Sequence, residues 1–154
     1  MGVEIERKFL LAGDCWRALG TPLLLRQGYL SADPARVVRV RVAGDQAWLT
    51  IKGRSVGATR GEWEYPIPLA DANALLDDLC EQPIIEKYRR EIAHAGHIWE
   101  VDEFLGANQG LVVAEIELAA EDQPFDKPDW IGADVTHDAR YFNSSLVKRP
   151  YSSW

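Results

Sequence analysis

The chain has 154 residues, 47% of them hydrophobic, so it can form one domain with one core and is too apolar to be disordered. It carries 17 Lys and Arg against 24 Asp and Glu, a formal net charge of −7. Such a chain repels nucleic acid and anionic membranes unless its basic residues are clustered. Cys15 and Cys80 lack a CxxC spacing and predict neither a zinc site nor a disulfide framework. The first residues are too charged for a signal peptide and no apolar run reaches 18 residues, so we expect a cytoplasmic protein.

Short segments in which apolar and polar residues alternate recur along the chain, separated by turn residues. This alternation is typical of β-strands. We expect eight of them, at residues 3–10, 24–30, 35–42, 47–52, 61–67, 84–92, 97–103 and 110–119. Gly44-Asp45 and Ala95-Gly96 are expected hairpin turns. Eight strands at this spacing favour an antiparallel sandwich or barrel.

Two or three helices interrupt the strand pattern. Residues 70–79 place Leu75, Leu76 and Leu79 at helical spacing, with Asp71 as the expected N-cap. Shorter helices are expected at residues 14–19 and 138–147, and an irregular surface loop at 120–137. The predicted fold is therefore mainly β (α+β), in a single domain over residues 1–154, with the helices packed outside the strands.

The charged residues of the expected strands form pairs of one sign. Residues i and i+2 of a strand share a face, so each pair lies on one side of the sheet. The pairs are Glu4 with Glu6 (followed by Lys8), Arg39 with Arg41, Lys52 with Arg54, Glu62 with Glu64, Lys87 with Arg89, Glu100 with Asp102, and Glu115 with Glu117. A solvated face would explain any one strand. Solvation gives no reason, however, for signs to be segregated by strand, whereas a binding surface does.

A closed barrel with the charged face inward would turn this pattern into a ligand site. Eight strands enclose room for one small ligand, and the outer apolar face would then need helices to cover it. Converging Arg and Lys side chains suit a polyanion, especially phosphate oxygens. The carboxylates would repel that anion unless hard cations lie between, and Mg²⁺ binds through one or two carboxylates, waters and substrate phosphates. The charges therefore predict a metal–polyphosphate complex in the lumen.

The order of these motifs resembles a known family. EIERK at residues 4–8 is an ExExK motif, followed by RQGYL at 26–30, RVR at 39–41, TIKG at 50–53, EKYR at 86–89, DEF at 102–104 and EIEL at 115–118. Along its whole length the chain resembles the CYTH domain superfamily, the triphosphate tunnel metalloenzymes. Its ending, RYFNSSLVKRP at 140–150, is similar to that of the small bacterial members.

The resemblance implies an eight-stranded antiparallel tunnel that binds triphosphate-containing substrates with Mg²⁺ or Mn²⁺. Activities in the superfamily include inorganic triphosphatase, thiamine triphosphatase, RNA 5′-triphosphatase and class IV adenylate cyclase. The compact length resembles the bacterial inorganic triphosphatases most. We therefore expect hydrolysis of tripolyphosphate to pyrophosphate and phosphate.

The resemblance also suggests a role for each charged residue. The expected metal ligands are Glu4, Glu6, Glu115 and Glu117, with Glu62, Glu64 and Asp102 for a second metal or its water. The expected phosphate-binding residues are Lys8, Arg39, Arg41, Lys52, Arg54, Lys87 and Arg89. Glu100 and Glu103 are expected to be surface charges. The alternatives are paired surface carboxylates and cross-strand salt bridges.

Lys8 and Tyr29 are the expected catalytic pair. A deprotonated lysine, or a tyrosinate beside a lysine, could act as general base on water. In the alternative, Lys8 binds phosphate, Tyr29 packs, and a metal activates the water. The three histidines, His94, His97 and His137, are expected to have no role in the site.

Several alternative functions remain open from the sequence. They are a class IV-type adenylate cyclase that forms cyclic AMP and pyrophosphate, a triphosphatase for thiamine triphosphate or nucleotides, and a non-catalytic polyphosphate-binding module. The acidic balance argues against an RNA substrate. We expect a small-molecule polyphosphate substrate, no nucleic-acid or membrane partner, and either a monomer or a homodimer.

Overall fold

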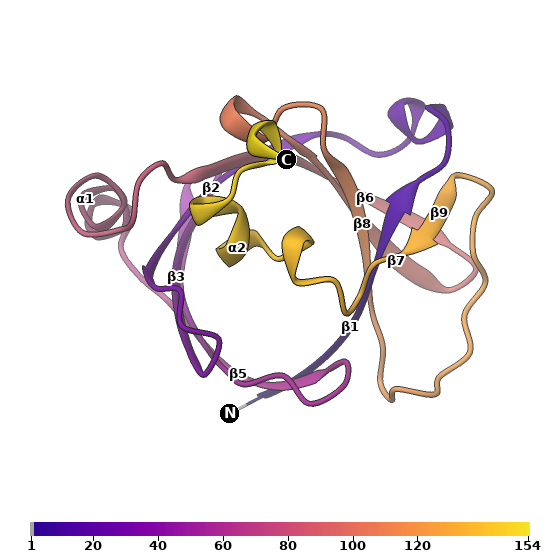
Figure 1. Ribbon diagram of the computed structural model, residues 1–154, viewed down its shortest axis with the longest axis horizontal. Coiled ribbons are helices and arrows are strands. Elements are labelled where there is room, and N and C mark those ends of the chain that lie inside the picture. The colour runs from indigo at the N-terminus through magenta and orange to yellow at the C-terminus, as the bar shows by residue number, and fades with distance from the viewer. Residues whose placement is uncertain (1) are drawn as a thin grey trace.

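The computed structural model describes residues 2–154, in which one antiparallel sheet curls into a ring (Figure 1). The strands are β1 (Gly2–Leu11), β2 (Leu23–Ser31), β3 (Arg36–Ala43), β4 (Gln46–Gly53), β5 (Thr59–Pro66), β6 (Ile85–His94), β7 (His97–Phe104), β8 (Val112–Glu117) and β9 (Ile131–Asp134). The α-helices are α1 (Leu69–Asp78) and α2 (Asn143–Lys148). Short 3₁₀ helices are η1 (Cys15–Ala18), η2 (Gly106–Asn108), η3 (Ala139–Tyr141) and η4 (Tyr151–Ser153).

The first strand closes the ring. The strands follow the order β5-β4-β3-β2-β6-β7-β8-β1, and β1 also pairs with β5. The N-terminal half of β1 pairs with β5, for example Val3 with Gly61, whereas its second half pairs with β8, for example Lys8 with Glu115. The predicted eight-stranded antiparallel closed barrel is therefore confirmed.

A ninth strand lies where the sequence predicted an irregular loop. Within residues 120–137, β9 pairs with the end of β1, where Phe9 faces Asp134 and Leu11 faces Ile131. Four residues are too few to show an alternation that identifies a strand from sequence. The strand is defined instead by its tertiary partner, β1.

Two hairpin turns are confirmed. Ala43 pairs with Gln46 across Gly44-Asp45, and His94 pairs with His97 across Ala95-Gly96. In the second turn, Ala95 and Gly96 both have positive φ, 48° and 82°. Two positive φ angles are what a type I′ hairpin turn requires, and this turn type matches the twist of the flanking strands.

Helix α1 packs on the outside of the barrel, against β3 and β4. Its buried Ala72 and Leu76 form one core cluster with Val40 and Ala47 of those strands. The helix also lies close to β2, because a Cβ on Gly28 would be 3.0 Å from the Leu76 Cδ2. The predicted N-cap at Asp71 is wrong, since the helix starts after Pro68 and Asp71 lies in the first turn. There its negative charge still favours the helix dipole.

A second outer core covers the opposite side of the barrel. The indole of Trp99 on β7 is fully buried and packs edge-on against Phe9, Phe125 and Trp130 at centroid distances of 5.6, 5.8 and 6.0 Å. Trp16 of η1 belongs to the same cluster. Edge-to-face packing is favourable for aromatic rings. The outward apolar face of the strands is thus covered here by loops and β9.

The C-terminal segment lies within the ring, where Figure 1 shows α2 and the turn before it. Its Tyr141, Leu146 and Val147 pack against inward-facing residues such as Phe104 and Val113. The expectation that helices pack outside therefore holds for α1 and fails for α2, which closes one end of the lumen. No helix within residues 2–154 is long and apolar enough to cross a membrane.

Candidate functional site

A cavity of about 570 Å³ occupies the barrel interior and is lined mainly by charged side chains. The inward direction that alternation predicted is found for nearly every candidate residue. Those lining the cavity are Glu4, Glu6, Lys8, Tyr29, Arg39, Arg41, Lys52, Glu62, Glu64, Lys87, Arg89, Glu115 and Glu117. The two candidates outside its lining are Arg54, which is exposed in the β4–β5 loop, and Asp102.

The closed strand order sorts these charges into two halves. The neighbouring strands β7, β8, β1 and β5 contribute the carboxylates, whereas β4, β3 and β6 contribute most of the basic residues. Between β3 and β6, strand β2 contributes the neutral Tyr29. A carboxylate wall therefore faces a basic wall, with Lys8 and Arg60 as the exceptions on the acidic side.

Asp102 holds two basic residues in place below the cavity surface. It is fully buried, accepts two hydrogen bonds from Arg89 at 2.8 Å each, and lies 2.8 Å from the Lys87 Nζ. Burial would raise the pKa of Asp102, but the charges of Arg89 and Lys87 outweigh it and lower the pKa to about 2. Its oxygens are already bonded and it does not line the cavity, whereas the sequence suggested Asp102 as a ligand of a second metal or its water.

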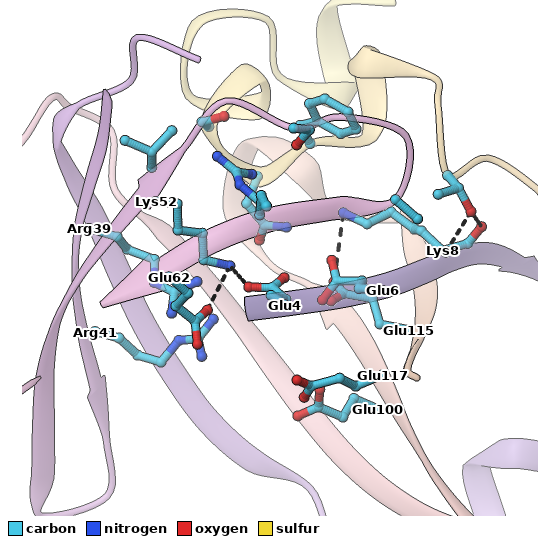
Figure 2. A pocket seen from close by; sticks show the side chains of 18 of the residues that line it. Glu4, Glu6, Lys8, Arg39, Arg41, Lys52, Glu62, Glu100, Glu115 and Glu117 are labelled. Atoms are coloured by element: carbon cyan, nitrogen blue, oxygen red, sulfur yellow. Dashed lines mark hydrogen bonds and ion pairs between the residues drawn. The ribbon is translucent and has the colours of Figure 1, made fainter. Parts of the chain in front are cut away.

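The carboxylates of Glu4 and Glu62 both form ion pairs with one lysine. The Lys52 Nζ lies 2.6 Å from the Glu4 Oε2 and 3.4 Å from the Glu62 Oε2 (Figure 2). A hydrogen bond to Glu4, together with burial, raises the pKa of Glu62 to about 7. Burial opposes ionisation of Glu4, but its bond with Glu62 and the charge of Lys52 lower its pKa. Three ionisable groups therefore share a small space here.

Glu6 and Glu115 are a second close carboxyl pair (Figure 2). Burial, followed by the charges of Glu115 and Glu4, raises the pKa of Glu6 well above its usual value. Burial opposes ionisation of Glu115, but Lys8 and Arg89 lower its pKa. A carboxyl that neighbouring carboxylates keep protonated can exchange that proton for a cation. The pair therefore has the electrostatics of a cation site.

The donor set fits a cation that also binds substrate. Within residues 2–154, no three Asp, Glu, His or Cys side chains are arranged to hold a metal ion by themselves. Mg²⁺ uses few protein ligands, because it keeps several waters and binds substrate phosphates. The adjacent strands β1 and β8 supply such a small set of carboxylates: Glu6, Glu115 and Glu117. Glu6 and Glu117 lie directly opposite each other in the pairing of the two strands.

Arg41 is a cation without a carboxylate partner. No acidic oxygen of residues 2–154 lies within 4.0 Å of its guanidinium, whose Nε donates to the Gln27 Oε1 at 3.0 Å. Burial, together with Arg39 and Arg89, lowers the pKa of Arg41 to about 9, so the group is charged at neutral pH. Arg39 is partly paired, 3.7 Å from Glu64. A half-buried guanidinium without a carboxylate partner favours an anion beside it.

The pKa values of the two buried lysines are shifted in opposite directions. Burial would lower the pKa of Lys8, but the charges of Glu115 and Glu6 outweigh it and raise the pKa. Burial lowers the pKa of Lys87 to about 7, with Arg89 and Arg41 acting in the same direction and Asp102 against it. Lys8 is thus held as a cation, 3.1 Å from the Tyr141 carbonyl oxygen and 3.6 Å from Glu115.

Several lining residues were not predicted. Glu100 was expected on the surface, but it lines the cavity and lies 2.8 Å from Arg89. His137, expected to have no role, and Arg60 line it too. Period-two spacing from Asp102 and Glu62 could have identified Glu100 and Arg60, since residues i and i−2 share a face. Thr136, Phe142, Asn143 and Ser144 reach the cavity from the C-terminal segment, whose inward course has no local sequence signal.

Comparisons with known proteins found matches along nearly the whole chain. The profile of the CYTH domain family matches residues 2–151. An inorganic triphosphatase of Acetivibrio thermocellus is 54% identical over 154 residues, covering 100% of this chain and 99% of its own. An inorganic triphosphatase of Nitrosomonas europaea is 35% identical over 148 residues, with 94% and 96% covered. The crystal structure of an inorganic triphosphatase superposes with a TM-score of 0.64 at 33% identity, covering 96% of this chain and 95% of that one.

Proposed function

We propose that this chain, which belongs to the CYTH domain family, is an inorganic triphosphatase that hydrolyses tripolyphosphate to pyrophosphate and phosphate in its barrel. The full-length identity of 54% to a triphosphatase supports the activity. The observation that carries the proposal is the pair of opposed walls, because a basic wall alone would suit any anion. A facing carboxylate wall requires cations between itself and the anion, as a metal-bound polyphosphate provides.

Substrate binding falls to the basic wall. Arg39, Arg41, Lys52 and Arg89 present guanidinium and ammonium groups to the cavity from three strands. Guanidinium groups bind phosphate oxygens through two parallel hydrogen bonds, which orients as well as attracts the chain. Arg41 has no carboxylate partner that a phosphate would have to displace before it binds to the guanidinium. We expect it to make the strongest contact with the bound triphosphate.

Mg²⁺ or Mn²⁺ fits the acidic wall, where Glu4, Glu6, Glu115 and Glu117 would hold it. When bound, the cation neutralises phosphate oxygens and lowers the pKa of its water. Glu62 and Glu64 line the same cavity and stand as ligands of a second ion or of its water. Asp102 is better explained as the group that orients Arg89 and Lys87, because its oxygens bond to both.

Proton transfer is the step for which the sequence suggested Lys8 with Tyr29. Since its pKa is raised, Lys8 suits phosphate binding better than a base role. Lys87 lines the same cavity with a pKa near 7 and can accept a proton at neutral pH. We therefore assign the base role to Lys87, which the side chains of Asn143 and Gln27 link to the Tyr29 hydroxyl. Lys8 stays a cation at the closed end.

The deciding experiment measures the products formed from inorganic triphosphate and from ATP, with Mg²⁺, with Mn²⁺ and with chelator. We expect metal-dependent conversion of triphosphate to equal amounts of pyrophosphate and phosphate, and much slower attack on ATP. Cyclic AMP from ATP would replace the triphosphatase by a cyclase. Tight triphosphate binding without any product would leave a binding module.

A further inference from the structure

The neutral side-chain amides of Gln27 and Asn143 form hydrogen bonds that link polar groups of the cavity wall. Gln27 lies on β2, is fully buried, and does not line the cavity. Asn143 is the first residue of α2 and does line it. Their side chains come from segments 116 residues apart and meet at a distance of 3.1 Å.

Every polar atom of the Gln27 amide has a partner that belongs to the site. Its Oε1 accepts from the Arg41 Nε at 3.0 Å. Its Nε2 donates to the Tyr29 hydroxyl at 3.3 Å and to the Asn143 Oδ1 at 3.1 Å. A buried amide with all its bonds made is fixed in one orientation, because turning it over would place donor against donor.

Asn143 extends this network to the lysine of the site. Its Oδ1 accepts from Gln27 and also from the Lys87 Nζ at 2.8 Å. The C-terminal segment that closes the barrel therefore also fixes Lys87. Through two amides, the positions of Arg41, Tyr29 and Lys87 depend on one another.

The neutrality of these partners distinguishes them from the other partners in the cavity. Arg89 is held by the carboxylate of Asp102, whose negative charge offsets much of the positive charge of Arg89. Gln27 holds Arg41 without neutralising it, so the full charge of Arg41 stays available to a phosphate. A carboxylate at position 27 would hold the guanidinium equally well and compete with the substrate for it.

We propose that Gln27 and Asn143 are positioning residues that orient Arg41, Tyr29 and Lys87 for the triphosphate while leaving the positive charge of Arg41 without a carboxylate partner. The proposal rests on the proposed function for its kinetic readout, but its binding readout does not require turnover. The proposal gives a functional role to Gln27, which does not line the cavity, and to Asn143, the first residue of α2.

The test compares Gln27→Glu with Gln27→Met. The glutamate keeps the acceptor for Arg41 but adds a charge and removes both donors, whereas methionine removes all three bonds at similar volume. For Gln27→Glu we expect KM for inorganic triphosphate, and its Kd measured by calorimetry without metal, to rise about tenfold or more. For Gln27→Met we expect a fall in kcat of about tenfold and a smaller change in Kd, since Arg41 keeps its charge.

Gln46→Glu is the matched control, because Gln46 is exposed at the start of β4 and the change adds the same charge. If Gln27→Glu and Gln46→Glu weaken triphosphate binding equally, the effect is one of net charge and the proposal is wrong. Thermal unfolding of each variant accompanies the kinetics, so that a loss of folded protein is not read as a loss of binding.

Asn143→Ala provides a second approach should the Gln27 variants fold poorly, because Asn143 is half-exposed. The two buried donors that lose it as an acceptor keep other partners: the Gln27 Nε2 keeps Tyr29 and the Lys87 Nζ keeps Asp102. We expect kcat to fall with a nearly unchanged melting temperature. The double variant Gln27→Met/Asn143→Ala should lose little more than either single variant, because both break one network. Additive losses would overturn the coupling. Wild-type protein that binds triphosphate but releases no phosphate would contradict the proposed function, while the Kd comparison would still decide this proposal.

Discussion

Arg89 on β6 donates from its Nε and one terminal nitrogen to the two oxygens of Asp102 on β7, at 2.8 Å each, and the carboxylate is fully buried. Lys87 donates to the same carboxylate at 2.8 Å. One carboxylate thus fixes the side chains of two basic residues in the cavity wall. In a buried ion pair the removal of one partner is costly, because the other stays desolvated and unpaired.

The variant Asp102→Asn should therefore be strongly destabilised. We expect the free energy of unfolding, from urea denaturation without metal, to fall by about 3 kcal/mol. Asp77→Asn is the control, because Asp77 is exposed and lies 4.0 Å from Arg26, so its loss should change stability little. Equal stability of the two variants would show that Asp102 is not held as described.

The same carboxylate predicts a pH dependence of stability. The pKa of Asp102 in the folded protein is lowered to about 2, below the usual value of about 3.9 in unfolded chains. A lowered pKa means that its stabilising contribution is complete above the unfolded value and is lost as the pH falls through the folded one. The stability difference between wild type and Asp102→Asn should be constant between pH 5 and pH 7 and should shrink below about pH 4. Urea denaturation at pH 6 and pH 3 tests this, and an unchanged difference would refute the assigned pKa shift.

Substitution by arginine should have different effects at Lys87 and at Lys8. Arginine keeps a positive charge but does not act as a base at neutral pH, because it remains protonated. Lys87→Arg should lower kcat about 100-fold and remove the rise of kcat/KM through pH 7 that a base with this pKa produces. Lys8→Arg should keep most activity and the wild-type pH profile, because Lys8 is already charged. The reverse pattern in the pH profiles would restore Lys8 as the base.

Glu6→Gln should separate stability from metal binding. Burial and two neighbouring carboxylates raise the pKa of Glu6, so an amide there should leave the metal-free protein at least as stable as wild type. If Glu6 is a metal ligand, Mg²⁺ should raise the melting temperature of the wild type and should not raise that of the variant. Metal-dependent turnover should fall in parallel. An unchanged Mg²⁺ effect would remove Glu6 from the metal ligands.

Gly28→Ala should affect the fold and not the site. On the outer face of β2, its added Cβ would lie 2.8 Å from the Cys80 Cβ and 3.0 Å from the Leu76 Cδ2, so α1 and the residues after it must shift. We expect a loss of about 1–3 kcal/mol in the free energy of unfolding with an unchanged KM. Gly53→Ala is the matched control, because a Cβ on Gly53 has no heavy atom within 4 Å. Similar losses in both variants would mean that α1 does not pack as closely as described.

Local sequence determined which way each charged side chain points. Side chains alternate along strands, so Glu4 and Glu6, Arg39 and Arg41, and Glu115 and Glu117 were assigned to one face, and all six line the cavity. The same rule places Glu100 and Arg60 inward, and the prediction missed them because Glu100 was judged a surface charge and Arg60 was not considered. The two-residue turns were equally local, since their residue types fix their length and conformation.

Only the tertiary structure decided how those side chains meet. Closure of β1 on β5 and the pairing of β2 with β6 separate the acidic strands from the basic ones, and both contacts join segments far apart in the chain. These long-range contacts also made Asp102 a buried partner of Arg89 where the sequence suggested a metal ligand. Helix α2 lies inside because its apolar side chains match an inward ring that includes Val37, Ile85 and Val113, from three separate strands. A face pattern is read from neighbouring residues, whereas the match between two distant apolar surfaces exists only after the chain has folded.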